Sequence, residues 1–350
     1  MNESKFPTQC VFIDKNGNSK PPDCTIPIPF NENSTRAYSK KFRVYVLRDF
    51  LFRNFSHFQP SPSSSSLTSS CTADITVLDV AGGRGDLSWI LHNIDGINSI
   101  IADPRIPNHR RLLKSVHFLL NHPEEAKIRS VDGLPTHQPL AKLLPRLLAN
   151  YGTMSMSEIR STDDFLNGIT SPKYMRIHVD NTLIEALRKV IANNKNDDDG
   201  DVRVAWDGYW EDEQRRIESN KIYYGGTAPT KTATEMANDE ECNHIDNSRI
   251  ALNFFISLKL IVGFHPDQAT EASIDLALLL GIPFVVVPCC VFPSDFPDRT
   301  LDGKRVKTHS QFCDYLCRKH HKIRRETLPF VETDTAKNVV LYMLEQDICR

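Results

Sequence analysis

Short, uninterrupted apolar runs alternate with segments of helical spacing along this chain, which is the pattern of an α/β protein. Apolar runs that predict buried strands lie at residues 75–80, 99–102, 258–264 and 283–287. Helical spacing follows two of them, at 86–93 and at 271–280. Two further extended segments, 323–331 and 338–344, are joined by a polar turn and predict an antiparallel pair. We therefore expect a doubly wound parallel sheet that ends in an antiparallel hairpin.

Composition divides the chain into three parts. Residues 1–57 form an extension rich in Pro, Asn and Lys with helical spacing at 36–55, and residues 58–73 form a linker dominated by serine. Residues 74–350 are expected to be one α/β domain with a large insertion at about 107–255, since ordinary crossovers are far shorter. Inside the insertion, helices are predicted at 109–120, 140–150 and 183–192, a strand at 202–206, and polar loops at 193–201 and 231–247.

A glycine-rich turn joins the first predicted strand to the following helix, with the sequence Asp79-Val-Ala-Gly-Gly-Arg-Gly-Asp86. Such a turn offers free backbone N–H groups and the positive end of a helix dipole to a ligand. A P-loop requires Gly-Lys-Ser/Thr, which Asp86-Leu-Ser does not supply, and a dinucleotide turn requires a third glycine near Ser88. Asp79 and Asp86 suit a cationic ligand better than a pyrophosphate, and S-adenosylmethionine carries both a sulfonium and an ammonium group.

Asp103 ends the second predicted strand, 24 residues after Asp79. An acidic side chain at this place accepts hydrogen bonds from ribose hydroxyls in nucleotide-binding sheets. Helix capping or a surface salt bridge is the alternative role for each of these acids.

The segment Val77-Leu-Asp-Val-Ala-Gly-Gly-Arg-Gly-Asp-Leu-Ser88 resembles the first motif of class I S-adenosylmethionine-dependent methyltransferases. The resemblance implies a Rossmann-like, doubly wound sheet of seven strands with an antiparallel terminal hairpin. It also implies that Ala81 to Gly85 contact the methionine part of the cofactor and that Asp103 contacts the ribose. The expected cofactor-binding residues are Asp79, Ala81, Gly82, Gly83, Gly85, Asp86 and Asp103.

A second constellation follows the third long apolar run: Leu260-Ile-Val-Gly-Phe-His-Pro-Asp-Gln-Ala-Thr270, a helix, and Phe284-Val-Val-Val-Pro-Cys-Cys-Val-Phe292. It is similar to a methyltransferase branch that contains the zinc-finger-bearing eukaryotic tRNA ribose 2′-O-methyltransferases and methyltransferase-like relatives. Those relatives have Gly-x-His followed by Cys-Gly, where this chain has Pro266-Asp267. The zinc-finger spacing of the tRNA enzymes does not occur before residue 75.

Placed at the end of the fourth strand of such a sheet, His265 and Asp267 are the candidate bases for methyl transfer to a hydroxyl or an ammonium group. A hydrogen-bonded structural histidine and a helix-capping aspartate are the alternatives. Gln268, Cys289 and Cys290 are expected to line the acceptor pocket. No metal site is expected: Cys313, Cys317, His320 and His321 have ligand chemistry, but the histidines lie where the helix should end.

Between Arg299 and Arg325 the chain has nine Lys or Arg against two Asp. This basic segment is a candidate RNA-binding surface, with an ordinary solvated surface as the alternative. The formal net charge of −2 gives no overall attraction to nucleic acid. The nine cysteines are scattered and odd in number, the N-terminus has no apolar signal region, and the apolar run 276–292 is broken by Gly and Pro. We expect the cytoplasm or nucleus and no membrane contact.

Three functions remain open from the sequence. The first is an S-adenosylmethionine-dependent methyltransferase that acts on RNA, with tRNA preferred by the resemblance. The second is a protein or small-molecule methyltransferase. The third is a catalytically inactive cofactor-binding partner subunit. The sequence does not indicate the oligomeric state.

Overall fold

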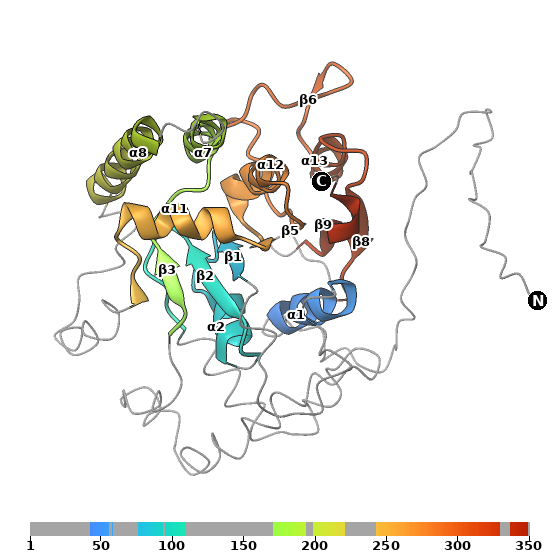
Figure 1. Ribbon diagram of the computed structural model, residues 1–350. Coiled ribbons are helices and arrows are strands. Elements are labelled where there is room, and N and C mark those ends of the chain that lie inside the picture. The colour runs from blue at the N-terminus through green and yellow to red at the C-terminus, as the bar shows by residue number, and fades with distance from the viewer. Residues whose placement is uncertain are drawn as a thin grey trace, which may run out of the picture.

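A computed structural model describes residues 43–55, 58, 76–93, 95–109, 171–193, 199–220, 243–329 and 337–348. Its centre is a seven-stranded sheet with helices on both faces (Figure 1). The strands of this sheet are β1 (Thr76–Val80), β2 (Asn98–Ala102), β3 (Lys173–Met175), β4 (Leu260–Phe264), β5 (Phe284–Val287), β8 (Arg324–Thr327) and β9 (Val339–Met343).

The strand order is β3-β2-β1-β4-β5-β9-β8. The first five of these strands run parallel to one another, and β9 is antiparallel to both β5 and β8. The chain builds outward from β1 in both directions, so that β2 and β4 flank it on opposite sides. In a sheet of this type the crevice beyond the carboxyl ends at such a switch point is the usual ligand site.

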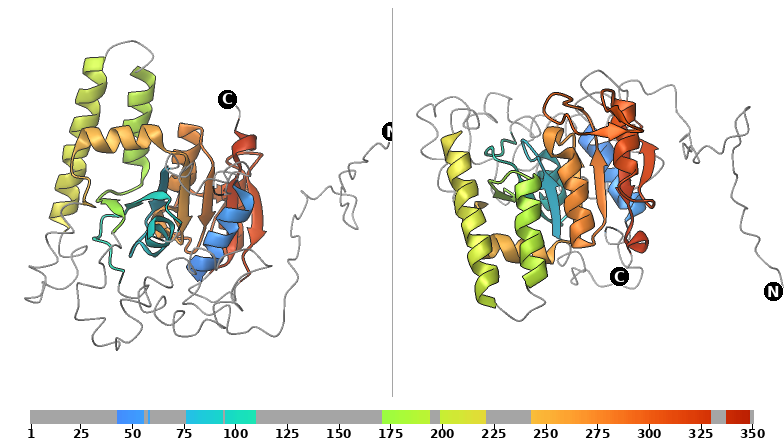
Figure 2. Two further views of the ribbon diagram at one scale, coloured as in Figure 1. Left: turned by 60° about the horizontal axis from the view of Figure 1, so that its bottom comes forward. Right: turned by 90° about the horizontal axis from the view of Figure 1, so that it is seen from above.

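Helices cover both faces of the sheet (Figure 2). One face packs against α1 (Arg43–Asn54) and α2 (Asp86–Asn93), and the other against α7 (Asn181–Asn193), α11 (Ser248–Ser257), α12 (Thr270–Leu280) and α13 (His309–Cys317). The long helix α8 (Asp199–Ser219) packs against α7 and α11. Shorter elements are η5 (Asp267–Ala269), η6 (Glu345–Asp347) and the hairpin of β6 (Thr300–Leu301) and β7 (Lys304–Arg305).

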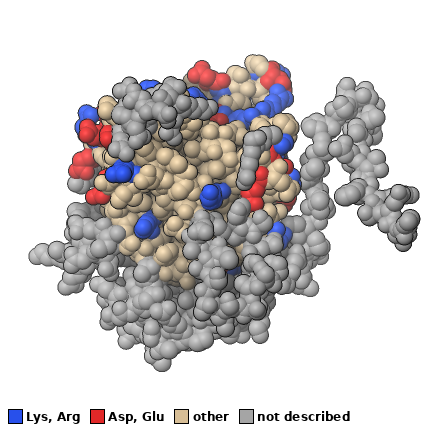
Figure 3. Space-filling model, viewed as in Figure 1, with Lys and Arg blue, Asp and Glu red and all other residues tan. Residues whose placement is uncertain are grey.

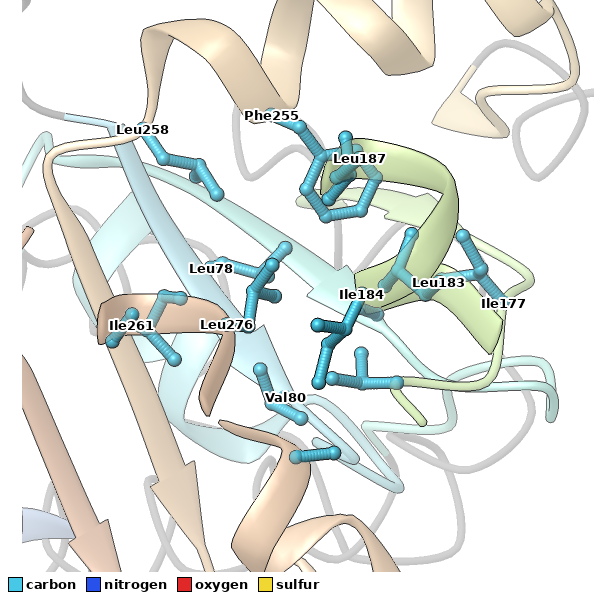
Figure 4. Packing of buried hydrophobic residues seen from close by; sticks show 14 of the residues in the cluster. Leu78, Val80, Ile177, Leu183, Ile184, Leu187, Phe255, Leu258, Ile261 and Leu276 are labelled. Atoms are coloured by element: carbon cyan, nitrogen blue, oxygen red, sulfur yellow. The ribbon is translucent and has the colours of Figure 1, made fainter. Parts of the chain in front are cut away.

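Successive strand residues point into different cores, which explains the continuous apolar runs. Val77 belongs to the core under α1 and α2, whereas Leu78 belongs to the core on the opposite face. Figure 4 shows that second core, where Leu78, Val80 and Ile261 of the sheet meet side chains from α7, α11 and α12. Burial on both faces therefore makes β1, β4 and β5 recognisable from sequence.

The helix α1 is an integral part of the domain and not a separate extension. Phe50 makes an edge-to-face contact with Tyr342 of β9, with ring centroids 5.1 Å apart. The buried Arg48 donates a hydrogen bond from Nε to Asp95 at 2.7 Å, which ties α1 to the loop after α2. The predicted boundary at residue 57 is therefore not a boundary in the packing.

The predicted strand at 202–206 is wrong, because these residues lie inside α8. Trp206 and Trp210 are four residues apart and lie on one buried helix face. Their indole N–H groups donate to the carbonyls of Ser248 at 2.7 Å and Asp246 at 3.1 Å. Helix α8 is thereby held to the start of α11.

The described parts of the predicted insertion supply the edge strand β3 and three helices, so they belong to the framework of the sheet. Most of the predicted helix at 109–120, the predicted helix at 140–150, most of the predicted loop at 231–247 and most of the serine-rich linker lie outside the described residues. None of the described helices has the length and apolar character needed to cross a membrane. The cytoplasm or nucleus remains a prediction.

Candidate functional site

Asp79 lies at the end of β1 and anchors the glycine turn to α2. It is 1% exposed, and its Oδ2 accepts hydrogen bonds from the Ser88 hydroxyl at 3.0 Å and the Ser88 N–H at 3.3 Å. A Cβ atom at Gly82 would lie 2.8 Å from the Asp79 carboxyl group, so the turn closes directly over this acid. Burial raises the pKa of Asp79 to about 7. Asp79 is therefore a structural acid beneath the turn.

The turn itself packs against β2. Gly85 has a φ of +73°, and a Cβ there would lie 2.3 Å from Cδ1 of Ile101, so any other residue would be strained and would displace Ile101. Ala81 also adopts a left-handed conformation, with a φ of 49°. Asp86 begins α2, where a carboxylate is favoured by the helix dipole.

Three backbone N–H groups of the turn, which were expected from the sequence to be free for a ligand, donate hydrogen bonds within the protein. Ala81 donates to the carbonyl of Ala102 at 2.8 Å, and Gly85 donates to the carbonyl of Gly82 at 2.8 Å. The N–H of Gly83 donates to the carboxylate of Asp103 at 2.9 Å. These three groups are not free to hold a ligand, so side chains around the turn remain as the groups that could contact one.

Asp103 lies at the end of β2, as predicted, and is 1% exposed. Besides the N–H of Gly83, its carboxylate accepts the N–H of Arg105 at 2.9 Å and both Nε (2.9 Å) and Nη2 (3.1 Å) of the Arg105 side chain. The Arg105 side chain is 54% exposed. Asp103 itself is buried, so a ligand with hydroxyl donors would have to displace the solvent-facing Arg105 side chain to reach its carboxylate.

A pocket of about 740 Å³ opens at the carboxyl ends of the parallel strands. Its volume is in the range that holds a small-molecule ligand. Four residues predicted from sequence line it: Ala81, Asp103, Asp267 and Gln268. Among the described residues, the other predicted site residues lie outside its lining: Asp79, Gly82, Gly83, Gly85, Asp86, His265, Cys289 and Cys290.

The lining of this pocket is strongly acidic. Seven carboxylates contribute to it, against three arginines: Asp103, Asp180, Asp267, Glu271, Asp275, Asp295 and Asp298, with Arg105, Arg216 and Arg299. Arg299 is 5% exposed and lies 3.5 Å from the centre of the Phe296 ring. Its Nε donates to Glu271 at 2.5 Å, so the positive charge of Arg299 is neutralised within the pocket wall. The pocket is suited to a cationic ligand.

The carboxylate of Glu271 collects donors from three side chains on that wall. Besides Arg299, the Tyr315 hydroxyl donates at 2.6 Å and the Lys319 ammonium group lies 2.7 Å away. Burial raises the pKa of Glu271, but these hydrogen bonds outweigh it and bring the pKa below its ordinary value. Glu271 is therefore ionised at neutral pH.

Asp267 and Gln268 follow β4 at the mouth of the pocket. Asp267 has a left-handed φ of 48°, and its Oδ1 accepts a hydrogen bond from the Cys289 thiol at 3.1 Å. Burial and the neighbouring Asp267 raise the pKa of that thiol. Gln268 donates from Nε2 to Asp295 at 2.7 Å. Asp267 thus belongs both to the pocket and to the cysteine pair.

His265 is placed differently from Asp267. Its ring stacks on Phe264 with centroids 4.4 Å apart, and its Nε2 lies 2.8 Å from the carbonyl oxygen of Lys337. Because a carbonyl only accepts, Nε2 carries the proton and donates. Burial lowers the pKa of His265 to about 4, so the ring is neutral at pH 7. These contacts match the structural alternative for His265.

A His–Glu pair on the pocket wall was missed by sequence reasoning. His178, in the loop after β3, lines the pocket, and its Nδ1 lies 2.6 Å from Oε1 of the buried Glu213 in α8. The His178 N–H donates to the same oxygen at 2.7 Å. Next to this pair, Arg216 forms an ion pair with Asp180 at 2.6 Å. Thirty-five residues separate His178 from Glu213, and no local spacing connects them.

The basic segment is largely neutralised in the fold. Five of its nine basic side chains form ion pairs, three of them with acids outside the segment. The pairs are Arg299–Glu271, Arg318–Asp302, Lys319–Asp275, Arg324–Asp347 and Arg325–Asp314. Figure 3 shows Lys and Arg beside Asp and Glu at the top of the view, where β6 lies in Figure 1. Exposed positive charge is concentrated at Lys304, Arg305 and Lys307 on and after the β6–β7 hairpin.

The cysteines and histidines near the end of α13 do not gather around one point. Cys313 is buried beside His309, and His320 and His321 follow the end of the helix. In the described part of the chain, one group of three or more metal-ligand side chains comes together: Asp267, Cys289 and Cys290.

Comparisons of the chain with protein-family models, curated proteins and solved structures found no match.

Proposed function

We propose that this protein is an S-adenosylmethionine-dependent methyltransferase. The observation that carries the proposal is the acidic pocket at the carboxyl ends of the parallel strands, with seven carboxylates against three arginines. The sulfonium and ammonium groups of S-adenosylmethionine are cations, whereas the phosphates of a nucleotide would be repelled there. Supporting the proposal, the sheet has seven strands and the antiparallel arrangement of β9 that the resemblance implies.

The cofactor's ribose is proposed to bind Asp103, since this buried carboxylate lines the pocket and exchanges its Arg105 donors for hydroxyl groups. Ala81 borders the same space, and the turn of Gly82, Gly83 and Gly85 shapes it by holding Ala81 and Asp103 together. Asp79 and Asp86 are proposed to affect cofactor binding indirectly. Asp79 fixes the position of the turn through Ser88, and Asp86 adds a negative charge at the start of α2.

When bound, the cofactor supplies a methyl group for in-line displacement by a nucleophile. The chain's contribution is alignment of the acceptor with that methyl group, and good alignment can lower a reaction barrier by about 7–11 kcal/mol. Gln268 is held by Asp295 at the pocket mouth, where it can orient an acceptor. Asp267 is the proposed group that accepts a proton from a hydroxyl or ammonium acceptor. His265 supports the loop behind it through Lys337.

RNA is proposed as the acceptor because the exposed positive charges of Lys304, Arg305 and Lys307 can bind its phosphates. A protein or small-molecule acceptor and a catalytically inactive partner subunit are the competing proposals. Transfer of labelled methyl groups to fractionated extract, treated with nuclease or with protease, distinguishes the acceptor classes. Binding of the cofactor without any labelled product would favour the inactive subunit.

The decisive first experiment is calorimetric titration of the full chain with S-adenosylmethionine and S-adenosylhomocysteine. We expect saturable binding of both nucleosides, and we expect the Asp103→Asn variant to lose affinity for both to a similar extent. Absence of heat with both nucleosides, in protein shown to be folded by circular dichroism, would remove the proposal.

A further inference from the structure

Three potential metal ligands converge beside the pocket, from two loops that are far apart in sequence. The ligand atoms of Asp267, Cys289 and Cys290 all lie within 4.8 Å of one another. The loops follow β4 and β5, which are parallel neighbours with Phe264 paired to Val287, so their carboxyl ends meet at one edge. The fold itself therefore brings the carboxylate to the thiols.

The chemistry of this cluster is that of a zinc site. Zinc in proteins is bound by thiolates at about 2.3 Å and by carboxylate oxygens at about 2.0–2.2 Å, in tetrahedral geometry. Ligand atoms around one such ion are roughly 3–4 Å apart, and those of the cluster all lie within 4.8 Å of one another. Cys289 is half-buried and Asp267 and Cys290 are exposed, so an ion has access from solvent.

We propose that Asp267, Cys289 and Cys290 form a zinc-binding site at the edge of the pocket. Three protein ligands leave a fourth position for water or a substrate atom, which is the arrangement of catalytic and not structural zinc. Because Asp267 also lines the pocket, the open position lies close to whatever the pocket holds. In the metal-free protein Asp267 is the proton acceptor proposed above, whereas with zinc bound it would act on an acceptor through the metal.

Zinc binding is measured directly and does not depend on the methyltransferase proposal. The full chain, purified under a thiol reductant and stripped with a chelator, is titrated with Zn²⁺ and, separately, with Co²⁺. We expect one tightly bound ion and, with Co²⁺, a thiolate-to-metal absorption band of a tetrahedral site. Cys289→Ser, Cys290→Ser and Asp267→Asn should each weaken binding at least tenfold, and the two serine variants should lower the Co²⁺ band.

Cys317→Ser is the matched control, because this half-buried thiol lies in α13 outside the cluster. It should bind Zn²⁺ and Co²⁺ as the unaltered chain does. The chain has further cysteines and histidines, so the variants decide where an ion binds. The proposal is overturned if the unaltered chain binds no ion at micromolar Zn²⁺, or if a double Cys289→Ser, Cys290→Ser variant keeps the same affinity and spectrum. Circular dichroism establishes that each variant is folded.

Discussion

The carboxylate of Asp103 and the backbone N–H of Gly83, 2.9 Å apart, join the end of β2 to the glycine turn after β1. The same carboxylate holds the exposed guanidinium of Arg105, which occupies the face that a ribose would use. Asp103 therefore has a structural role, and under the proposed function it also binds the ribose of the cofactor.

We predict that Asp103→Asn weakens S-adenosylhomocysteine binding about tenfold to a hundredfold, since a hydrogen bond to a charged group contributes about 1.5–3 kcal/mol. Arg105→Gln removes the competing donors and should leave affinity equal or higher. Calorimetry measures both. A large loss of affinity in Arg105→Gln would mean that Arg105 itself binds the ligand.

Gly85→Ala should destabilise the fold by about 2–4 kcal/mol. The new Cβ would lie 2.3 Å from Ile101. The alanine would also have to adopt a left-handed φ of +73°. Gly96→Ala is the matched control, since its φ is +68° but nothing lies within 4 Å of the new Cβ. It should cost only about 1–2 kcal/mol of conformational strain. Urea denaturation compares the two, and equal losses would show that packing against β2 contributes nothing.

The pH dependence of stability should report the burial of Asp79. Its pKa is about 7 in the folded protein, against an ordinary value of 3.8 in the unfolded chain. The folded protein therefore keeps a proton that the unfolded chain has lost, and the resulting stability is present below pH 3.8 and is lost as the pH rises through 7. Asp79→Asn does not titrate, so its free energy of unfolding should rise relative to the unaltered protein between pH 4 and 7.5, by roughly 2–4 kcal/mol.

Denaturant titrations at several pH values measure that trend. The exposed Asp212→Asn in α8 is the control, because folding changes the surroundings of this side chain little. A constant difference between Asp79→Asn and the unaltered protein over this range would show that Asp79 is ionised in the fold.

Much of the sheet was predictable, because strands buried on both faces leave continuous apolar runs that a single sequence reveals. The bounds of α2 were predicted to the residue, since Asp86 marks its start. The edge strand β3 has only three residues and no such run. Helix α8 was misread at 202–206, where Trp206 is buried by α11 and not by a sheet. In each missed case the tertiary partner, not the local pattern, determines the element.

The same division applies to the site. Asp103 and Asp267 were predicted because each follows a recognisable strand, and both line the pocket. His178 and Glu213 depend on a contact across 35 residues, and the Cys289–Asp267 contact spans 22. Side chains that meet through the fold leave no spacing signal in the chain.

The exposed basic side chains of the β6–β7 hairpin are the proposed RNA-binding surface. A double charge reversal, Lys304→Glu with Arg305→Glu, should weaken RNA binding and reduce its dependence on salt. With fewer phosphate contacts, binding releases fewer counterions from the RNA. Arg215→Glu is a control for charge reversal elsewhere on the surface, since Arg215 is a highly exposed arginine on α8 that pairs with Asp212, away from the β6–β7 hairpin. Filter binding of tRNA at several salt concentrations measures both variants. Since Arg325 is already paired with Asp314, the hairpin should dominate over the rest of the basic segment. Equal binding by the hairpin variant and the unaltered protein would exclude this surface and favour a protein or small-molecule acceptor.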